Sequence, residues 1–209
     1  MTLKLFEKVL RDECKKSYKN LIDGSRQKRL TERSVNSLRD IMFIGRANPL
    51  TLYQSCIITF GTVLEKATSN YAQLNGKKVY SNKNFLAAKI DIVFRINKNV
   101  YNLESKGNIE LDAGKTKKAL ETLRRKHKMV FNGLDCQTEG FQVISKFVVW
   151  SKATAKDAAK VAKRPITEEY LMGFQNFFEL FNVEVSEKDF FKMLREVWLD
   201  EVERHFPKY

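Results

Sequence analysis

Three charged residues whose side chains could act together in catalysis lie in two consecutive strand-like segments. Asp91 lies in segment 88–96, and Glu104 and Lys106 lie in segment 100–106. Both segments are rich in β-branched and aromatic residues, and residues 97–99 (Asn-Lys-Asn) between them are typical of a turn. Successive side chains of a strand point to opposite faces, so Glu104 and Lys106 share a face, and a hairpin can bring Asp91 beside them.

Two carboxylates and a lysine at one strand end suit the hydrolysis of a phosphodiester bond. Carboxylate oxygens bind hard divalent cations, and the cation polarises the phosphoryl oxygen and lowers the pKa of a bound water. The lysine can stabilise developing charge or orient the water. Because the set contains no thiolate or imidazole, Mg²⁺ is the expected cofactor, with Mn²⁺ as a substitute. The alternative is a surface hairpin that carries an incidental Glu-Lys pair.

This arrangement resembles the PD-(D/E)xK nuclease superfamily, best known from type II restriction endonucleases. The resemblance spans roughly residues 54–150 and is carried by Asp91, a gap of twelve residues, and the run Glu104, Ser105, Lys106. Ile90 stands where the family often has proline. The resemblance implies that Asp91 and Glu104 bind the metal and that Lys106 is the third catalytic residue.

An acidic residue on the helix before the catalytic hairpin often reaches the metal site in this family. Glu65, beside the apolar stripe of the helix predicted over 51–74, is the matching residue. The resemblance therefore implies a fourth catalytic side chain at Glu65. A solvated glutamate that pairs with a nearby lysine is the alternative.

Composition and charge indicate a globular protein with a polyanionic partner. The chain has 209 residues and 43% apolar residues, which fits one domain with a real core. Its net charge of +13 is uneven, because residues 1–165 hold 33 basic and 15 acidic residues, whereas residues 166–206 hold four and ten. A nucleic acid would contact the first part and avoid the second, although many basic proteins are basic for solubility alone.

Cysteines and histidines are few and scattered. Cys14, Cys56 and Cys136 show neither metal-ligand spacing nor a disulfide framework, so we expect a reducing, cytoplasmic location. His127 and His205, both expected at the surface, argue against a histidine-based zinc site or a Ser-His-Asp triad. No apolar run approaches the ~20 residues of a membrane helix, and the first residues do not begin a signal peptide, so we expect no membrane partner.

Periodicity predicts an α/β arrangement around the hairpin. Helices are expected over 3–22, 34–44, 51–74, 115–131 and 152–164, and further strands over 79–80 and 141–150. Strand 141–150 is apolar enough to be buried on both faces. Strand, helix and strand in this order indicate a layered core, and the resemblance implies a restriction-endonuclease-like mixed central sheet flanked by helices. The resemblance implies a single nuclease domain whose core spans about 51–151, with helical additions at 1–48 and 152–209.

Two acidic amphipathic helices are predicted at the C-terminal end. Thr167 is the expected N-cap of the first, and Ser186 with Asp189 resembles a capping box for the second. Because ten acidic residues surround their aromatic stripes, these stripes are expected in the core or at a dimer contact rather than stacked on bases.

Basic side chains on two predicted helices are candidates for contacts with DNA. The candidates are Lys115, Lys117, Lys118 and Arg124 on the first helix, and Lys152, Lys156 and Lys160 on the second. A solvated basic face is the alternative for the second helix.

Together these features favour a type II restriction endonuclease, which hydrolyses double-stranded DNA with Mg²⁺. By resemblance, a homodimer would set two sites across a palindrome. Repair nucleases, junction resolvases and phage or transposon nucleases share the motif and remain alternatives. A non-catalytic basic DNA-binding protein and an RNA-binding or assembly protein are alternatives of other classes.

Overall fold

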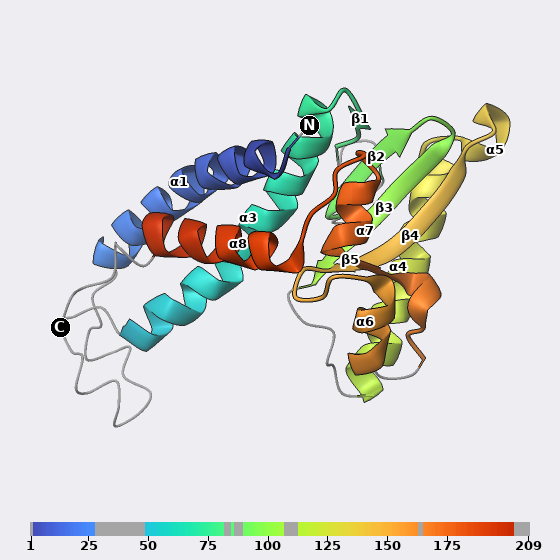
Figure 1. Ribbon diagram of the computed structural model, residues 1–209. Helices are drawn as coiled ribbons and strands as arrows, with labels where there is room; N and C mark the ends of the chain where they lie inside the picture. Colours follow the sequence, from blue (N-terminus) through green and yellow to red (C-terminus); the bar gives the residue numbers. More distant parts are fainter. Residues whose placement is uncertain are drawn as a thin grey trace.

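A five-stranded mixed sheet forms the centre of the computed structural model, with helices in front of it and behind it (Figure 1). The structure describes residues 2–27, 49–81, 85, 90–106, 113–162 and 165–202. The strands are β1 (Lys78–Val79), β2 (Ile92–Ile96), β3 (Asn99–Lys106), β4 (Gln142–Val149) and β5 (Leu171–Gly173), in the spatial order β1-β2-β3-β4-β5. Strands β1 to β3 pair antiparallel, and β3, β4 and β5 pair parallel. The predicted α/β class is confirmed.

The helices are close to those predicted around the hairpin. They are α1 (Leu3–Gln27), α3 (Pro49–Leu74), α4 (Ala113–Gly133), α5 (Cys136–Glu139), α6 (Ala155–Val161), α7 (Phe174–Glu179) and α8 (Glu187–Glu201). Helix α1 continues through Gly24, so its predicted end at residue 22 is wrong. One glycine inside a helix costs about 1 kcal/mol of helix stability, which the other residues of a long helix can offset. The helix predicted over 34–44 and residues 88–89 of the predicted strand lie outside the described residues. Among the described residues, no helix combines the length and the apolar character that crossing a membrane requires.

A tight turn joins β2 to β3, as the sequence predicts. Asn97 adopts a φ of 54°, a left-handed conformation that asparagine tolerates better than most residues. The pairing runs from Ile96 opposite Asn99 to Ile92 opposite Leu103. This register decides which side chains of the hairpin share a face.

One face of the sheet packs against α1, α3, α7 and α8 in a large apolar core. Ile92, Phe94 and Leu103 of the hairpin belong to it. Aromatic rings from distant segments fill this core: Phe6, Tyr71, Trp150, Phe174, Phe177, Phe178, Phe181 and Phe190. The aromatic stripes of the C-terminal segment therefore lie in the core, which is the first of the two locations expected from the sequence.

The opposite face packs against α4 and α6. Leu120 and Leu123 of α4 cluster with Phe147 and Val149 of β4, and Val130 further along α4 packs against the hairpin. Their neighbours in β4, Val148 and Trp150, lie in the core of the first face. Burial of β4 on both faces, predicted from its apolar run, is confirmed.

The first acidic helix predicted at the C-terminal end is wrong over its first part. Residues 171–173 form strand β5, with Leu171 paired to Phe147, because pairing with the buried β4 outweighs the local helical periodicity. A Cβ on Gly173 would lie 2.2 Å from the carbonyl oxygen of Ala153, so only glycine fits this approach. Thr167 does not cap a helix with its side chain; it precedes a short 3-10 turn (Glu168–Tyr170).

The Ser186 N-cap predicted for the last helix is confirmed, while the Asp189 carboxylate accepts a hydrogen bond of 2.6 Å from the Ser186 hydroxyl. The Ser186 hydroxyl accepts a hydrogen bond of 3.1 Å from the Asp189 backbone N–H at the start of α8. Such a cap satisfies a backbone donor that the first helical turn leaves unpaired. This cap depends on two residues that are close in the sequence, so it can be predicted from the sequence.

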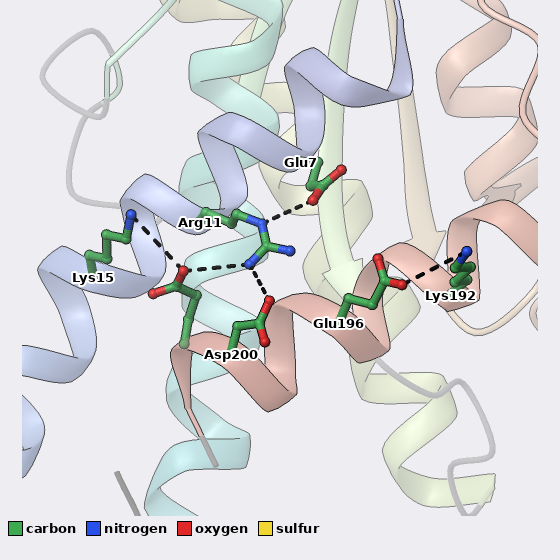
Figure 2. Close-up of polar contacts among 7 residues, drawn as sticks. Glu7, Arg11, Lys15, Lys192, Glu196 and Asp200 are labelled. Carbon is green, nitrogen blue, oxygen red and sulfur yellow. Dashed lines mark hydrogen bonds and ion pairs between the residues drawn. The ribbon is translucent and has the colours of Figure 1, made fainter. Parts of the chain in front are cut away.

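Ion pairs join the first helix to the last, which lie side by side (Figure 1). Figure 2 shows Arg11 of α1 between Glu7 of the same helix and Asp200 of α8, at 2.9 Å from each carboxylate. The same guanidinium lies 3.5 Å from the buried carboxylate of Glu201, which Lys15 approaches to 4.0 Å. These contacts connect the N-terminal and C-terminal helical segments over the first face of the sheet.

Candidate active site

The hairpin brings the two acidic motif residues together at one end. Ile92 pairs with Leu103, so Asp91, one residue before, lies beside Glu104, one residue after. Lys106 lies two residues further along β3 on the same face as Glu104. Asp91 itself precedes the first residue of β2, so it stands where the strand begins. The predicted convergence of Asp91, Glu104 and Lys106 is what the fold produces.

A second lysine, Lys126 of α4, completes this cluster. Lys106 Nζ lies 3.0 Å from Glu104 Oε1, while Lys126 Nζ contacts Glu104 Oε2. Lys126 Nζ also lies 3.6 Å from Asp91 Oδ1. One ammonium therefore touches both carboxylates, and each oxygen of Glu104 has its own lysine. We call these four residues the carboxylate–lysine cluster.

The cluster is buried at one end and more open at the other. The side chains of Lys126, Asp91 and Glu104 are 9%, 11% and 13% exposed, whereas that of Lys106 is 28% exposed. A solvent molecule or a ligand thus reaches the cluster most easily beside Lys106. Low exposure also strengthens each ion pair, because water screens it less.

The two carboxyl groups differ in their protonation behaviour. Burial raises the pKa of Asp91, and the adjacent Glu104 carboxylate raises it further, although Lys126 opposes both effects. Burial would also raise the pKa of Glu104, but hydrogen bonds and charges from Lys126 and Lys106 outweigh it and leave that pKa below its ordinary value. Asp91 is thus the carboxyl group of the pair whose charged form is less favoured, mainly because it is buried.

The donor chemistry of the cluster fits a hard divalent cation. Asp91 and Glu104 direct oxygens at one point, since both contact the same ammonium. Among the described residues, no group of three or more His, Cys, Asp or Glu side chains could hold a metal. Two carboxylates would be enough for Mg²⁺, which usually keeps several waters and binds through one or two carboxylates plus substrate phosphate.

Glu65, implied as a fourth site residue, lies on α3. The neighbours Leu64 and Ala67 pack into the core of the first face, together with Leu103 of the hairpin. Glu104 and Lys106 project to the other face, towards α4. Glu65 itself is half-buried, and its part in the site stays a prediction.

Lys126 belongs to the cluster, although the residues predicted from the sequence do not include it. It lies among the many basic residues of α4, yet only 7% of the residue is exposed. A signal was present, because Leu120, Leu123 and Val130 form the apolar stripe of α4, and position 126 falls between them at a three-residue step. A lysine on such a stripe requires a buried partner of opposite charge.

His127, expected at the surface, is half-buried. Its Nδ1 lies 3.1 Å from the hydroxyl of Ser145, which also accepts a hydrogen bond of 2.9 Å from the buried amide of Asn102. Burial lowers the pKa of His127. Asn102 precedes Glu104 by two residues on the same face of β3, so these polar contacts continue from the cluster along α4. His205 and the side chain of Cys56 lie outside what the structure describes.

Most of the candidate DNA contacts are exposed, although Lys160 also forms an ion pair of 2.8 Å with Asp157. Lys115, Lys117 and Lys118 are exposed on α4, and Lys156 and Lys160 on α6. The two helices pack against a common apolar cluster and lie near each other in Figure 1. Both helices therefore lie on the same face of the sheet.

Two of the candidates differ from the prediction. Arg124 donates to the hydroxyl of Tyr170 at 2.9 Å and stacks on its ring, so it is already engaged within the protein. Helix α6 begins at Ala155, after the cap residue Thr154, so Lys152 precedes it and does not share its face. The prediction that Lys152 lies on this helix is wrong, because the helix begins after the Thr154 cap.

Comparisons with family models, with curated proteins and with solved structures find no match for this chain. The likeness to the nuclease superfamily therefore depends on the residues of the cluster and on their positions.

Proposed function

We propose that this protein is a metal-dependent endonuclease that hydrolyses double-stranded DNA, of the type II restriction kind. The observation that carries the proposal is the convergence of Asp91, just before β2, and Glu104, in β3, on a single cationic group. Lys106 flanks this point on its more exposed side. An acidic pair that already binds one cation is the arrangement that a catalytic metal requires.

Each residue of the motif has a role in this proposal. Asp91 and Glu104 hold Mg²⁺ or Mn²⁺ through their carboxylate oxygens. The bound cation supplies Lewis acidity towards the phosphate and a water of lowered pKa. Lys106, at the open side, contacts the non-bridging oxygens of the scissile phosphate and stabilises the charge that develops there. The order of catalytic strand β3, crossover helix α4 and parallel strand β4 is the order expected from the family resemblance.

The exposed lysines of α4 and α6 support DNA as the substrate. They lie on the side of the sheet that also carries Glu104 and Lys106, since α4 packs on that face. Phosphate contacts from such lysines would hold the duplex next to the cluster.

Two copies of the chain on one palindrome would let each cut one strand. Light scattering of the protein with and without a DNA duplex measures this stoichiometry.

A second candidate function is a basic DNA-binding protein without catalysis. It is favoured by one observation: the two carboxylates and two lysines of the cluster neutralise each other, as in a structural ion network. In this case the cluster would only fix α4 against the hairpin.

Incubation of supercoiled and linear phage DNA with the protein separates the two candidates. Discrete bands in MgCl₂ and none in EDTA support a restriction endonuclease, and a smear supports a less selective nuclease. Intact DNA with retarded mobility supports the binding protein. Sequencing of the cleaved ends then gives the recognition sequence, and undiminished cleavage in excess EDTA would exclude the metal mechanism.

A further inference from the structure

Lys126 is held in the cluster by the helix that carries it. Leu123 and Val130, on either side along α4, are buried against the sheet, so the side chain between them must also point to the sheet. Its side chain is 9% exposed, and its ammonium has Glu104 and Asp91 as charged neighbours. A buried ammonium of this kind is stable only while carboxylates surround it.

The same oxygens would be ligands of the metal. Lys126 uses one oxygen of each carboxylate, and Lys106 uses the other oxygen of Glu104. An ammonium and a divalent cation repel each other at such separations in a poorly screened site. The two cations therefore exclude each other from the space between Asp91 and Glu104.

We propose that the Lys126 ammonium is the resident counter-ion of the Asp91–Glu104 pair and that a divalent cation binds the pair only by displacing it. This inference rests on the proposed function, because it concerns the metal that the function requires. Displacement also adjusts the charge. With the metal bound and Lys126 withdrawn, the two carboxylates, Lys106 and the metal carry a net charge of one positive unit, which matches one phosphodiester.

Metal affinity after substitution of Lys126 tests the exchange directly. Lys126→Met keeps an unbranched apolar stem and removes the charge, and Lys126→Arg keeps a charge. Lys128→Met is the matched control, because Lys128 is exposed two residues along the same helix. Each protein is titrated with MnCl₂, and binding is measured by calorimetry and by the electron paramagnetic resonance signal of free Mn²⁺. Lys126→Met should bind Mn²⁺ at least tenfold more tightly than wild type does. Lys128→Met should equal wild type, and Lys126→Arg should bind no more tightly than wild type.

Thermal unfolding supplies a readout that does not depend on activity. In EDTA, Lys126→Met should unfold at a lower temperature than wild type, because two carboxylates face each other without their ammonium. MnCl₂ should raise its unfolding temperature by more than it raises that of wild type or of Lys128→Met. A Lys126→Met protein that folds only with Mn²⁺ present supports the exchange as well.

Chemical labelling of the wild-type protein tests displacement without any substitution. An amine-acetylating reagent should modify exposed Lys128 equally with and without MnCl₂, as measured by peptide mass spectrometry. Lys126 should be protected in EDTA and should become several times more reactive when Mn²⁺ is bound. A Lys126 that stays protected while Mn²⁺ binds overturns the exchange, whatever the folding of the variants.

The outcomes separate this inference from the function on which it rests. If neither wild type nor Lys126→Met binds Mn²⁺, and neither cleaves DNA with it, the metal site and the proposed function both fail. If wild type binds Mn²⁺ and cleaves DNA while Lys126→Met binds it with equal affinity, the function stands and the exchange is wrong.

Discussion

The indole Nε1 of Trp150 donates a hydrogen bond of 2.9 Å to the hydroxyl of Ser105, the residue between Glu104 and Lys106. Neighbours alternate along β3, so Ser105 faces the aromatic core while Glu104 and Lys106 face α4. The bond thus holds the end of β3 from the side opposite to the cluster. This hydrogen bond joins the end of β3 to Trp150, which is only 2% exposed.

Ser105→Ala should lower the free energy of unfolding by about 1–3 kcal/mol, the cost of leaving a buried donor without a partner. Denaturation in urea measures this loss, and Ser105→Thr, which retains a hydroxyl, serves as the control. DNA cleavage at saturating MgCl₂ should change far less than in variants of the cluster. Unchanged stability would show that this hydrogen bond does not form in solution.

Replacing the motif residues should slow cleavage strongly while DNA binding persists. Asp91→Asn, Glu104→Gln and Lys106→Ala should each lose about 10²–10³ in rate, the usual loss for one preorganised charge in an active site. Fewer carboxylates repel DNA less, so the two acidic variants should bind DNA in calcium at least as well as wild type. Rates are measured on plasmid in MgCl₂, with exposed Glu139→Gln as a control. Wild-type rates in Asp91→Asn or Glu104→Gln would make the hairpin purely structural.

The same variants should differ in stability. Removal of one partner of a buried ion pair costs up to about 3–5 kcal/mol. Glu104 contacts both lysines, whereas Asp91 lies 3.6 Å from one. Glu104→Gln should therefore lower the free energy of unfolding more than Asp91→Asn does, as urea denaturation can measure. The reverse order would show that Asp91 is the main partner of Lys126.

Charge reversal on α4 and α6 should weaken DNA binding for every sequence alike. Lys117→Glu, Lys118→Glu, Lys156→Glu and Lys160→Glu each remove a candidate phosphate contact. Each lost contact should reduce the slope of log K against log salt by about 0.9, measured by fluorescence anisotropy in CaCl₂. Lys188→Glu and Lys192→Glu, exposed on the acidic α8, are controls that should not change the slope. Affinity independent of salt would place the DNA surface elsewhere.

The contact between the first and last helices should be measurable as stability. Arg11→Met removes the 2.9 Å contacts with Glu7 and Asp200 shown in Figure 2 and the 3.5 Å contact with Glu201, whose side chain is 6% exposed. The expected loss is about 2 kcal/mol, between the values for exposed and for buried pairs. Lys192→Met removes the exposed 3.9 Å pair with Glu196, also in Figure 2, and should cost almost nothing. Equal losses in the two variants would exclude a special role for Arg11.

The thiol of Cys14, close to this network, should be unreactive in the folded protein. Burial raises its pKa to about 12, and the Glu201 carboxylate adds to the effect. A pKa above the ordinary 9.0 means that the folded state favours the neutral thiol, so this stabilisation is complete below pH 9.0 and is lost as the pH rises towards 12. Alkylation by iodoacetamide at pH 8.5, mapped on peptides, should be much slower at Cys14 in folded than in urea-unfolded protein. Equal rates would contradict its burial.

The sequence by itself determined the features that arise from neighbouring residues. Alternation over 92–96 and 100–106, with turn residues between, specifies a hairpin, and its register brings Asp91 beside Glu104. The Ser186 cap depends on a residue three positions away. Residues 141–150 are apolar enough that their burial on both faces could be predicted.

Only the tertiary structure decided what depends on partners far along the chain. Residues 171–173 begin a segment with helical periodicity, yet they pair with β4 as a strand. The hydrogen bonds and side-chain packing gained at the edge of the sheet outweigh the local preference of the segment for a helix. In the sequence, Lys126 cannot be distinguished from the other basic residues of its helix. The packing of α4 on the sheet directs its side chain towards Glu104. Periodicity shows that a helix has an apolar face, whereas packing decides which charged groups meet that face, and here it sets a lysine between the two acidic residues.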